Sequence, residues 1–227
     1  MDPDTVTDIR NRCRLVLIAS PAGEIPASIQ SVKKAVAGGD VASVILAAFG
    51  ASDEAFREWC ETVVPIIQAA GAAAIVVDDT QGAGRAKADG IHVRAEKAAL
   101  GDTVRKYQPK MIVGTEALSS RHDALELGEE RPDYLFIGKL NGDTQPQANP
   151  VALELGEWWA SMIEIPCIVM SGYDLQSVVV AAKTGAEFVA ASASVFGEGR
   201  DPEVAVRTIN TLLDEHAPQF GEVADGN

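Results

Sequence analysis

Short apolar runs alternate with longer amphipathic stretches along most of the chain. The apolar runs are mostly continuous, which is typical of parallel strands that are covered on both faces. The runs are Leu15–Ile18, Val41–Ala48, Ala73–Val77, Gly90–Val93, Met111–Gly114, Tyr134–Gly138, Pro166–Met170 and Phe188–Ala191. Eight candidate strands separated by helices predict an α/β fold, a single (β/α)₈ TIM barrel, in preference to an open sheet.

The stretches between these runs have the polar and apolar spacing of helices. They are Ala27–Ala37, Ser52–Ala70, Glu96–Tyr107, Ser119–Glu129, Ala152–Ile163, Leu175–Thr184 and Asp201–His216. One connection, Gly82–Ala88, is short and rich in glycine, so its helix should be shortened. We expect one barrel over residues 13–216, between polar, flexible tails at 1–12 and 217–227.

Composition narrows the class of partner. A formal net charge of −14 over 227 residues, without clusters of Lys or Arg, argues against nucleic acid. Cys13, Cys60 and Cys167 are far apart, which indicates reduced thiols and a cytoplasmic protein. No apolar run reaches the roughly 18 residues of a membrane span, so we expect no membrane partner. The oligomeric state stays open, with a homodimer among the options.

A phosphate site is expected after the seventh and eighth strands, where barrels often bind phosphate. Gly172 lets the backbone approach a ligand closely, and Ser171 precedes it. The small residues Ser192, Ala193 and Ser194 could open a short helix whose amides face an anion. The predicted partner is therefore a small phosphorylated substrate or anion. The alternative is that the last three residues form only a tightly packed turn.

Two adjacent carboxylates follow the third strand. Asp78 and Asp79 offer hard oxygen ligands of the kind that hold a divalent cation. They could equally cap the following short segment or pair with Arg85 or Lys87. Spacing alone does not separate the two interpretations.

Lys139 and His92 complete the candidates for chemistry. Lys139 directly follows the Tyr134–Gly138 run and should project at the barrel mouth. It could bind a phosphate, act as a base or Schiff-base nucleophile if desolvated, or be a solvated surface lysine. His92 lies inside a predicted strand, where a hydrogen-bonded structural histidine is commoner than a catalyst, and it is kept as a candidate pocket residue.

The centre of the chain resembles thiamine phosphate synthase. Val76-Val77-Asp78-Asp79 followed by Lys87-Ala88-Asp89-Gly90-Ile91-His92-Val93 is similar to that family's Asn-Asp-Asp strand end and its Ala-Asp-Gly-Ile-His strand. Shorter matches continue in order: Ile112-Val113-Gly114, Pro132-Asp133-Tyr134, Ile165-Pro166, Thr184-Gly185-Ala186 and Asp201-Pro202-Glu203. The resemblance implies a (β/α)₈ barrel that joins a pyrimidine pyrophosphate to a thiazole phosphate with magnesium. A related thiazole tautomerase keeps the barrel and isomerises the thiazole ring.

Departures from the family pattern gather on its pyrophosphate side. The segment Val41–Gly50 has no charged residue where the family carries a Gln-x-Arg-x-Lys set, and Val77 replaces a polar Asn. Lys97 replaces the second metal-binding Asp. Magnesium at Asp78 should therefore be weak or absent, with Glu96 as the candidate replacement ligand.

At other positions of the family pattern, some residues are replaced and others are kept. Glu116 replaces a serine and would repel a pyrophosphate, and Thr144 is the remnant of a Thr-x-Thr-Lys region; both stay pocket candidates. Gly172 and residues 192–194 match the side that holds the thiazole phosphate, and Lys139 stands where the tautomerase has a histidine. We expect a barrel that binds or converts a phosphorylated thiazole-type precursor. The alternatives are a non-enzymatic ligand-binding barrel and a Schiff-base aldolase that uses Lys139.

Overall fold

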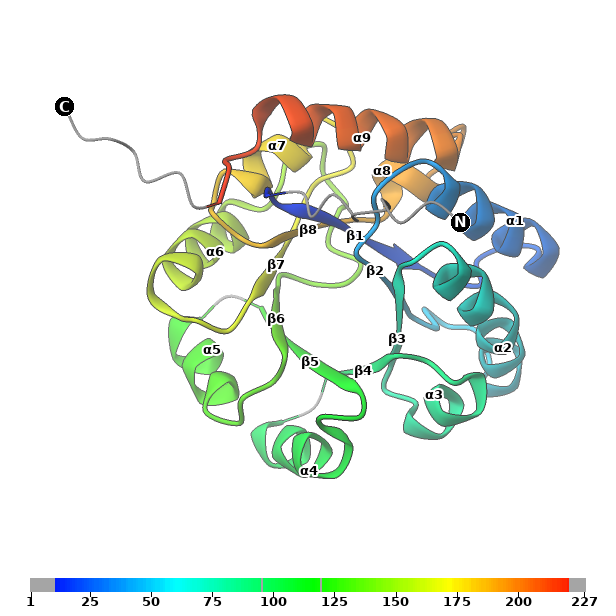
Figure 1. Cartoon of the computed structure of the whole chain (residues 1–227), viewed down its shortest axis with the longest axis horizontal. Helices are drawn as coiled ribbons and strands as arrows, with labels where there is room; N and C mark the ends of the chain where they lie inside the picture. The colour runs from blue at the N-terminus through cyan, green and yellow to red at the C-terminus, as the bar shows by residue number, and fades with distance from the viewer. Residues whose placement is uncertain (1–10, 95, 119, 221–227) are drawn as a thin grey trace, which may run out of the picture.

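The eight predicted strands are present, all parallel, and close into one barrel in sequence order. The computed structural model describes residues 11–94, 96–118 and 120–220, and β8 returns to pair with β1 (Figure 1). The strands are β1 (Arg14–Ala19), β2 (Ser43–Leu46), β3 (Ala73–Val77), β4 (Gly90–Val93), β5 (Ile112–Ala117), β6 (Tyr134–Ile137), β7 (Cys167–Met170) and β8 (Phe188–Ala191). The (β/α)₈ TIM barrel is confirmed.

Helices surround the barrel, one or two after each strand (Figure 1). They are α1 (Ile25–Ala37), α2 (Asp53–Ala69), α3 (Thr80–Ala86), α4 (Lys97–Tyr107), α5 (Arg121–Gly128), α6 (Pro150–Met162), α7 (Ser177–Ala182), α8 (Ala193–Phe196) and α9 (Pro202–His216). Side chains that accept from free backbone amides fix several helix starts, as Ser52 does for α2 and Asp201 for α9. The shortened helix predicted after β3 is α3, which ends at Lys87 in the left-handed conformation.

Alternation along the strands gives the protein two cores. One set of side chains fills the barrel interior, including Ile18, Ile45, Phe136 and Ile168. The other set packs between the strands and the helices, where Trp59 is almost completely buried. Every strand is therefore covered on both sides, which explains why the apolar runs are continuous.

Strand β5 is longer than the sequence predicts. We expected it to end at Gly114, but Thr115 pairs with Val93 of β4, and Ala117 pairs with Ile137 of β6. The hydroxyl of Thr115 donates to the Val93 carbonyl at 2.7 Å, so this buried polar residue is satisfied inside the sheet. As a result Glu116 belongs to the strand and has a fixed backbone.

The two ends of the described chain lie against each other. The Arg12 side chain is buried and donates to Asp214 at 2.8 Å and to the Asn210 side chain at 3.1 Å. The Phe220 amide donates to the carbonyl of Asn11. Residues 11–12 and 217–220 thus contact the barrel, whereas the remainder of both predicted tails, 1–10 and 221–227, lies outside the described residues.

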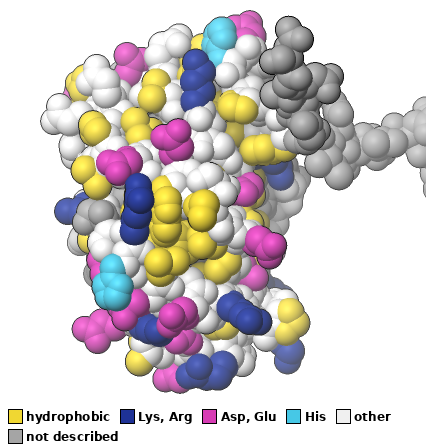
Figure 2. Space-filling view, turned by 90° about the vertical axis from the view of Figure 1, so that its left-hand side faces the viewer, with side chains coloured by type: hydrophobic (Ala, Val, Ile, Leu, Met, Phe, Trp, Pro, Cys, Tyr) yellow, Lys and Arg dark blue, Asp and Glu magenta, His cyan; other side chains and the backbone are white. Residues whose placement is uncertain are grey.

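One side of the barrel exposes apolar side chains. Leu125 of α5 and Val151 and Met162 of α6 are all exposed. Figure 2, which faces these two helices, shows apolar side chains gathered mid-face between charged ones. The Arg121 guanidinium covers the Trp158 ring there, 5.0 Å from its centroid. Among the described helices, none combines the length and the apolar composition that crossing a membrane requires.

Candidate active site

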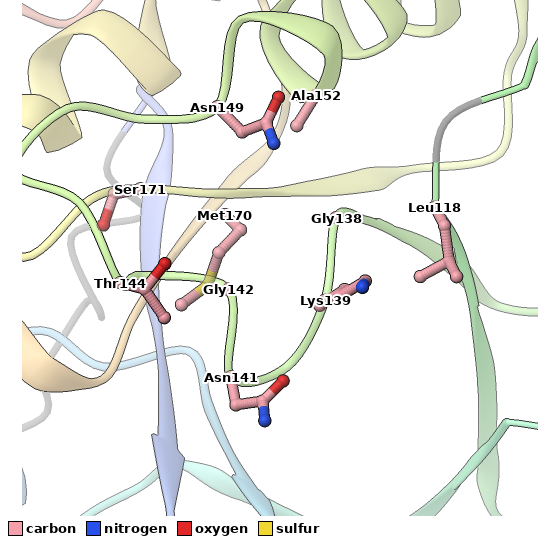
Figure 3. Close-up of a pocket in the computed structure, with 10 residues that line it drawn as sticks. All are labelled: Leu118, Gly138, Lys139, Asn141, Gly142, Thr144, Asn149, Ala152, Met170 and Ser171. Carbon is pink, nitrogen blue, oxygen red and sulfur yellow. The ribbon is translucent and has the colours of Figure 1, made fainter.

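Several cavities open at the carboxyl ends of the strands, and two of them are neighbours that share lining residues. The larger, of about 380 Å³, lies under the β6–α6 loop (residues 138–149). Figure 3 shows Lys139 and Leu118 on one side of it, and Thr144 and Ser171 on the other. The smaller cavity, of about 180 Å³, shares Leu118, Lys139 and Asn141 with the first. Its other lining residues are Phe49, Arg94, Glu116 and Leu140. Lys139 thus projects at the mouth as expected, and its side chain is exposed.

Asp78 is bound by an arginine that follows the next strand. Its carboxylate accepts from the Arg94 amide at 2.8 Å and from Arg94 Nε at 2.7 Å, and its backbone has a positive φ of 54°. Both carboxylate oxygens therefore already have donors. The pairing alternative raised for Asp78 is what the structure contains, although the partner is Arg94 and neither Arg85 nor Lys87.

Asp79 is engaged on both oxygens as well. Arg57 of α2 donates from Nε at 2.6 Å, and the Gly82 amide donates at 2.8 Å, so Asp79 caps α3 while it pairs with α2. Burial acts to raise the pKa of Asp79, but these donors outweigh it and lower the pKa below its ordinary value. Arg85 or Lys87 was expected to pair with Asp79, and the structure corrects that partner to Arg57.

Glu116 is a carboxyl group with an oxygen that has no partner. The side chain points into the barrel mouth from β5, and Oε2 is buried without a hydrogen bond to any described residue. Burial raises the pKa of Glu116, although Arg94 and Lys139 act in the opposite direction and Asp78 reinforces the shift. The group can therefore carry a proton closer to neutral pH than an ordinary glutamate.

His92 is part of the barrel interior. It is fully buried, its Nδ1 lies 2.9 Å from the Tyr134 hydroxyl, and the Phe136 ring meets it edge-on. Burial lowers the pKa of His92 to about 3, so the imidazole is neutral at physiological pH. These contacts support the structural interpretation of His92 over a place in the substrate pocket.

The residues predicted to bind phosphate already have an internal anion beside them. The Asp143 carboxylate, from the β6–α6 loop, accepts from the Ala193 amide at the start of α8. Asp143 is buried, which raises its pKa, while the amides of Ala193 and Ser192 act to lower it. The predicted phosphate donor at Ala193 is therefore occupied by the protein itself.

Gly172 is covered by the same loop. The Tyr173 amide donates to the Gln145 carbonyl, and the Asp174 amide donates to the Pro146 carbonyl. A Cβ placed on Gly172 would lie 2.3 Å from the Pro146 oxygen, so glycine is needed here for loop contact. The Gly172 amide donates to Ser177 Oγ. A substitution such as Gly172→Asp would therefore displace the loop whether or not phosphate binds here, so a loss of binding in that variant would not identify a phosphate site.

The neighbouring hydroxyls are mostly committed to the backbone. Ser171 Oγ donates to the Ala190 carbonyl, and Ser192 Oγ donates to the Ile18 carbonyl. Ser194 is fully buried, and its Oγ has no partner among the described residues. Thr144 is exposed at the rim of the larger cavity. The structure thus brings the predicted phosphate residues together, but it closes them beneath Asp143 and Pro146.

Comparison with known proteins identifies the family. The family model described as thiamine monophosphate synthase matches residues 15–195, which is most of the chain and the whole of the site. The chain belongs to the thiamine phosphate synthase family. The thiamine-phosphate synthase of Rhodospirillum centenum is 33% identical over 205 residues, covering 88% of this chain and 98% of that protein.

Further relatives agree with this assignment. The thiamine-phosphate synthase of Hyphomonas neptunium is 31% identical over 214 residues, 92% of this chain and 97% of its own. Among solved structures, the thiamine phosphate pyrophosphorylase of Pyrococcus furiosus superposes with a TM-score of 0.75 at 21% identity, covering 93% of this chain and all of that one. A 3-hexulose-6-phosphate synthase superposes at 0.67 with 16% identity, which shows the shared barrel alone.

The residues of this family member do not fit the magnesium that the family implies. Both oxygens of Asp78 are bound to Arg94, and both oxygens of Asp79 face Arg57 or Gly82. Within the described ranges, no three His, Cys, Asp or Glu side chains are grouped so that they could hold a metal ion. Glu96, the remaining candidate ligand, is exposed before α4. Lys97, at the position of the family's second metal-binding Asp, pairs with Glu129.

Two residues of the site, Arg94 and Asp143, lie in the segments that follow the fourth and sixth strands and were expected at the mouth, but the sequence indicated no role for either. Arg94 directly follows β4, and this position at the end of a barrel strand indicates that it belongs to the mouth. Asp143 lies in an irregular loop, 50 residues before its partner Ala193, and no spacing indicates that contact. The sequence therefore placed Asp143 at the mouth but did not indicate that it contacts Ala193.

Proposed function

We propose that this member of the thiamine phosphate synthase family binds or converts a small phosphorylated thiazole-type precursor and has little of the synthase's pyrophosphate transfer. The observation that carries the proposal is the state of Asp78 and Asp79. Arginine nitrogens already donate to both carboxylates, so neither Asp78 nor Asp79 is free to hold a metal ion. Transfer of a pyrophosphate-bearing group needs strong stabilisation of the leaving anion, which is usually the largest catalytic contribution.

The residues around Lys139, Gly172 and Ala193 support binding of the phosphorylated thiazole. Lys139 lines both cavities and offers a positive charge, while the loop that covers Gly172 and Ala193 is held by a few hydrogen bonds. A phosphate ester that displaces Asp143 would gain the same amide and an additional contact with Lys139. Lys139 stands in solvent, which does not favour the aldolase alternative, because a Schiff-base lysine requires desolvation.

A binding and turnover comparison tests the proposal. Calorimetric titration with the thiazole phosphate should show binding, and the unphosphorylated thiazole should bind at least tenfold more weakly. Lys139→Ala should weaken the phosphate ligand about tenfold, whereas Lys183→Ala, on an exposed helix end away from the mouth, should have no effect.

Turnover separates the proposal from an ordinary synthase. With both standard substrates and magnesium, we expect little product, and Asp78→Ala should change the rate little. Normal synthase rates that Asp78→Ala abolishes would overturn the proposal. Binding without conversion of the thiazole phosphate would select the non-enzymatic form of it, and equal affinity for the two thiazoles would remove the phosphate site.

A further inference from the structure

Arg94 is held in place with part of its guanidinium still available. Asp78 accepts from the backbone amide and from Nε, which fixes the base of the side chain and its plane. The two terminal nitrogens form no hydrogen bond to any described residue, and Arg94 lines the smaller mouth cavity. A planar fork of this kind matches the two oxygens of a carboxylate or phosphate. The available half of Arg94 is therefore a preformed donor for an anion.

Glu116 lies beside this fork. Val93 pairs with Thr115 across β4 and β5, so Arg94 and Glu116 are the next residues on the two adjacent strands. Both line the same cavity of about 180 Å³, and Arg94 is the cation that acts most strongly on the Glu116 carboxyl. Glu116 Oε2 is buried and unpartnered there. Buried polar atoms of this kind are uncommon in native proteins unless a water or ligand completes them.

Lys139 provides a second positive charge on the same cavity. It follows β6, the strand on the far side of β5, so Arg94 and Lys139 flank Glu116 on its two neighbouring strands. The apolar walls are Phe49, Leu118 and Leu140. Two cations, one unpartnered carboxyl oxygen and a partly apolar enclosure describe a site for a small organic anion with a short apolar body.

We propose that Arg94, Lys139 and Glu116 form a binding site for a small organic anion, a carboxylate or phosphate monoester, which is held with one proton shared with Glu116. The site does not include the amides at Ala193, although Lys139 lines both this cavity and the larger one, and it does not rest on the function proposed above. Ligand oxygens would accept from the Arg94 fork and from Lys139, and the protonated Glu116 would donate to the same anion.

The shared proton follows from the charges around Glu116. An ionised Glu116 would repel an anion in the same cavity, whereas the protonated form donates a hydrogen bond to it. Burial has the largest effect and, with Asp78 after β3, favours the protonated form, while Arg94 after β4, the Leu140 amide and Lys139 after β6 favour the ionised form. A bound anion also favours the protonated form of Glu116, so binding should draw a proton from solvent when Glu116 is ionised. Affinity should then rise as the pH falls through the titration of Glu116.

Calorimetry with sulfate and acetate tests this, sulfate being a tetrahedral oxyanion that does not titrate between pH 5 and 8. Sulfate affinity should fall up to about tenfold per pH unit above the Glu116 titration. Titrations in two buffers of different ionisation enthalpy should show uptake of up to one proton. Glu116→Gln should remove both the pH dependence and the proton uptake, and it should bind sulfate more tightly than the native protein at pH 8.

Arg94 is tested by Arg94→Gln, with Arg207→Gln as the matched control, since Arg207 is an exposed arginine paired with Glu203 on α9. Arg94→Gln should weaken both anions at least tenfold at every pH, and Arg94→Lys should fall between it and the native protein because the charge remains without the fork. Melting temperatures within a few degrees of the native value exclude unfolding as the cause. Unchanged sulfate binding in Arg94→Gln would overturn the site, and a retained pH slope in Glu116→Gln would overturn the shared proton. Acetate binding without sulfate binding would support a carboxylate ligand and refute the phosphate monoester.

Discussion

Replacing Asp143 by alanine should loosen the β6–α6 loop and expose the amides at the start of α8. The Asp143 carboxylate is the acceptor for the Ala193 amide, and its removal leaves that donor without a protein partner. A hydrogen bond to a charged group contributes roughly 1.5–3 kcal/mol, and the desolvation that raises the pKa of Asp143 offsets part of it. We therefore expect a loss of about 1–2 kcal/mol in the free energy of unfolding. For a chain of this length the melting temperature should fall by about 2–8 °C.

The same change should strengthen binding of a phosphate ester. In the native protein a ligand at the Ala193 amide must first displace Asp143, and this competition lowers the apparent affinity. Removing a competitor worth about 1–2 kcal/mol should increase affinity about 5- to 30-fold. The two main-chain hydrogen bonds from Tyr173 and Asp174 to the loop remain, so the site should keep its shape.

Asp143→Asn is the matched control. Its amide oxygen can still accept from Ala193 in nearly the same volume, so stability should stay within about 1 kcal/mol of the native protein and affinity should change little. Urea unfolding and calorimetric titration with the thiazole phosphate measure the two effects. If Asp143→Ala is destabilised but binds no more tightly, phosphate does not use the Ala193 amide. If it is neither destabilised nor tighter, Asp143 does not hold the loop.

Three further predictions concern the barrel and its acid behaviour. Gly114→Ala should cost about 1–3 kcal/mol in chemical denaturation, because the new Cβ would lie 2.0 Å from the Tyr134 ring; Gly84→Ala, at a position with open space, is the control and should cost little. The pKa of Asp79 is lowered in the folded state, so the stability it contributes is present above about pH 4 and is lost as the pH falls through its folded pKa. Asp79→Asn should flatten that acid limb of the unfolding curve, and an unchanged limb would refute the assignment. His92 has a folded pKa of about 3, so stability should fall as the pH drops below about 6.5, where the unfolded histidine binds a proton and the native one does not. The His92 ring resonances in NMR should accordingly stay constant between pH 5 and 8.

The sequence was sufficient for the fold because the strands are covered on both sides. Continuous apolar runs such as Ala73–Val77 and Phe188–Ala191 have the observed strand bounds. It failed at β5, where Thr115 and Glu116 look like the polar residues that follow a strand. Their polar character does not end the pairing, because the Thr115 hydroxyl is satisfied by β4 and Glu116 faces the mouth.

The site was predicted less completely, since its main contacts join segments far apart in the chain. The acids Asp78 and Asp79 were identified, yet their partners come from β4's end and from α2, and no local spacing encodes either. Chain neighbours such as Arg85 were the natural guess, but the observed partners are Arg94 and Arg57. The contact between Asp143 and Ala193 could be predicted only from the path of the whole β6–α6 loop, which is irregular.

The two unexpected contacts have a common electrostatic consequence. An arginine occupies the carboxylate that the family uses for a cation, and an aspartate occupies an amide predicted to bind an anion. Each internal ion satisfies a group that would otherwise be incomplete without ligand, so the unliganded mouth is already stable. Any ligand at those two places is then bound in exchange for an internal contact, which weakens binding by the free energy of that contact. The smaller cavity differs, because Arg94's terminal nitrogens and Glu116 Oε2 have no described partner to exchange. A small anion there displaces no internal contact, so its binding is weakened only by the proton that an ionised Glu116 must take up.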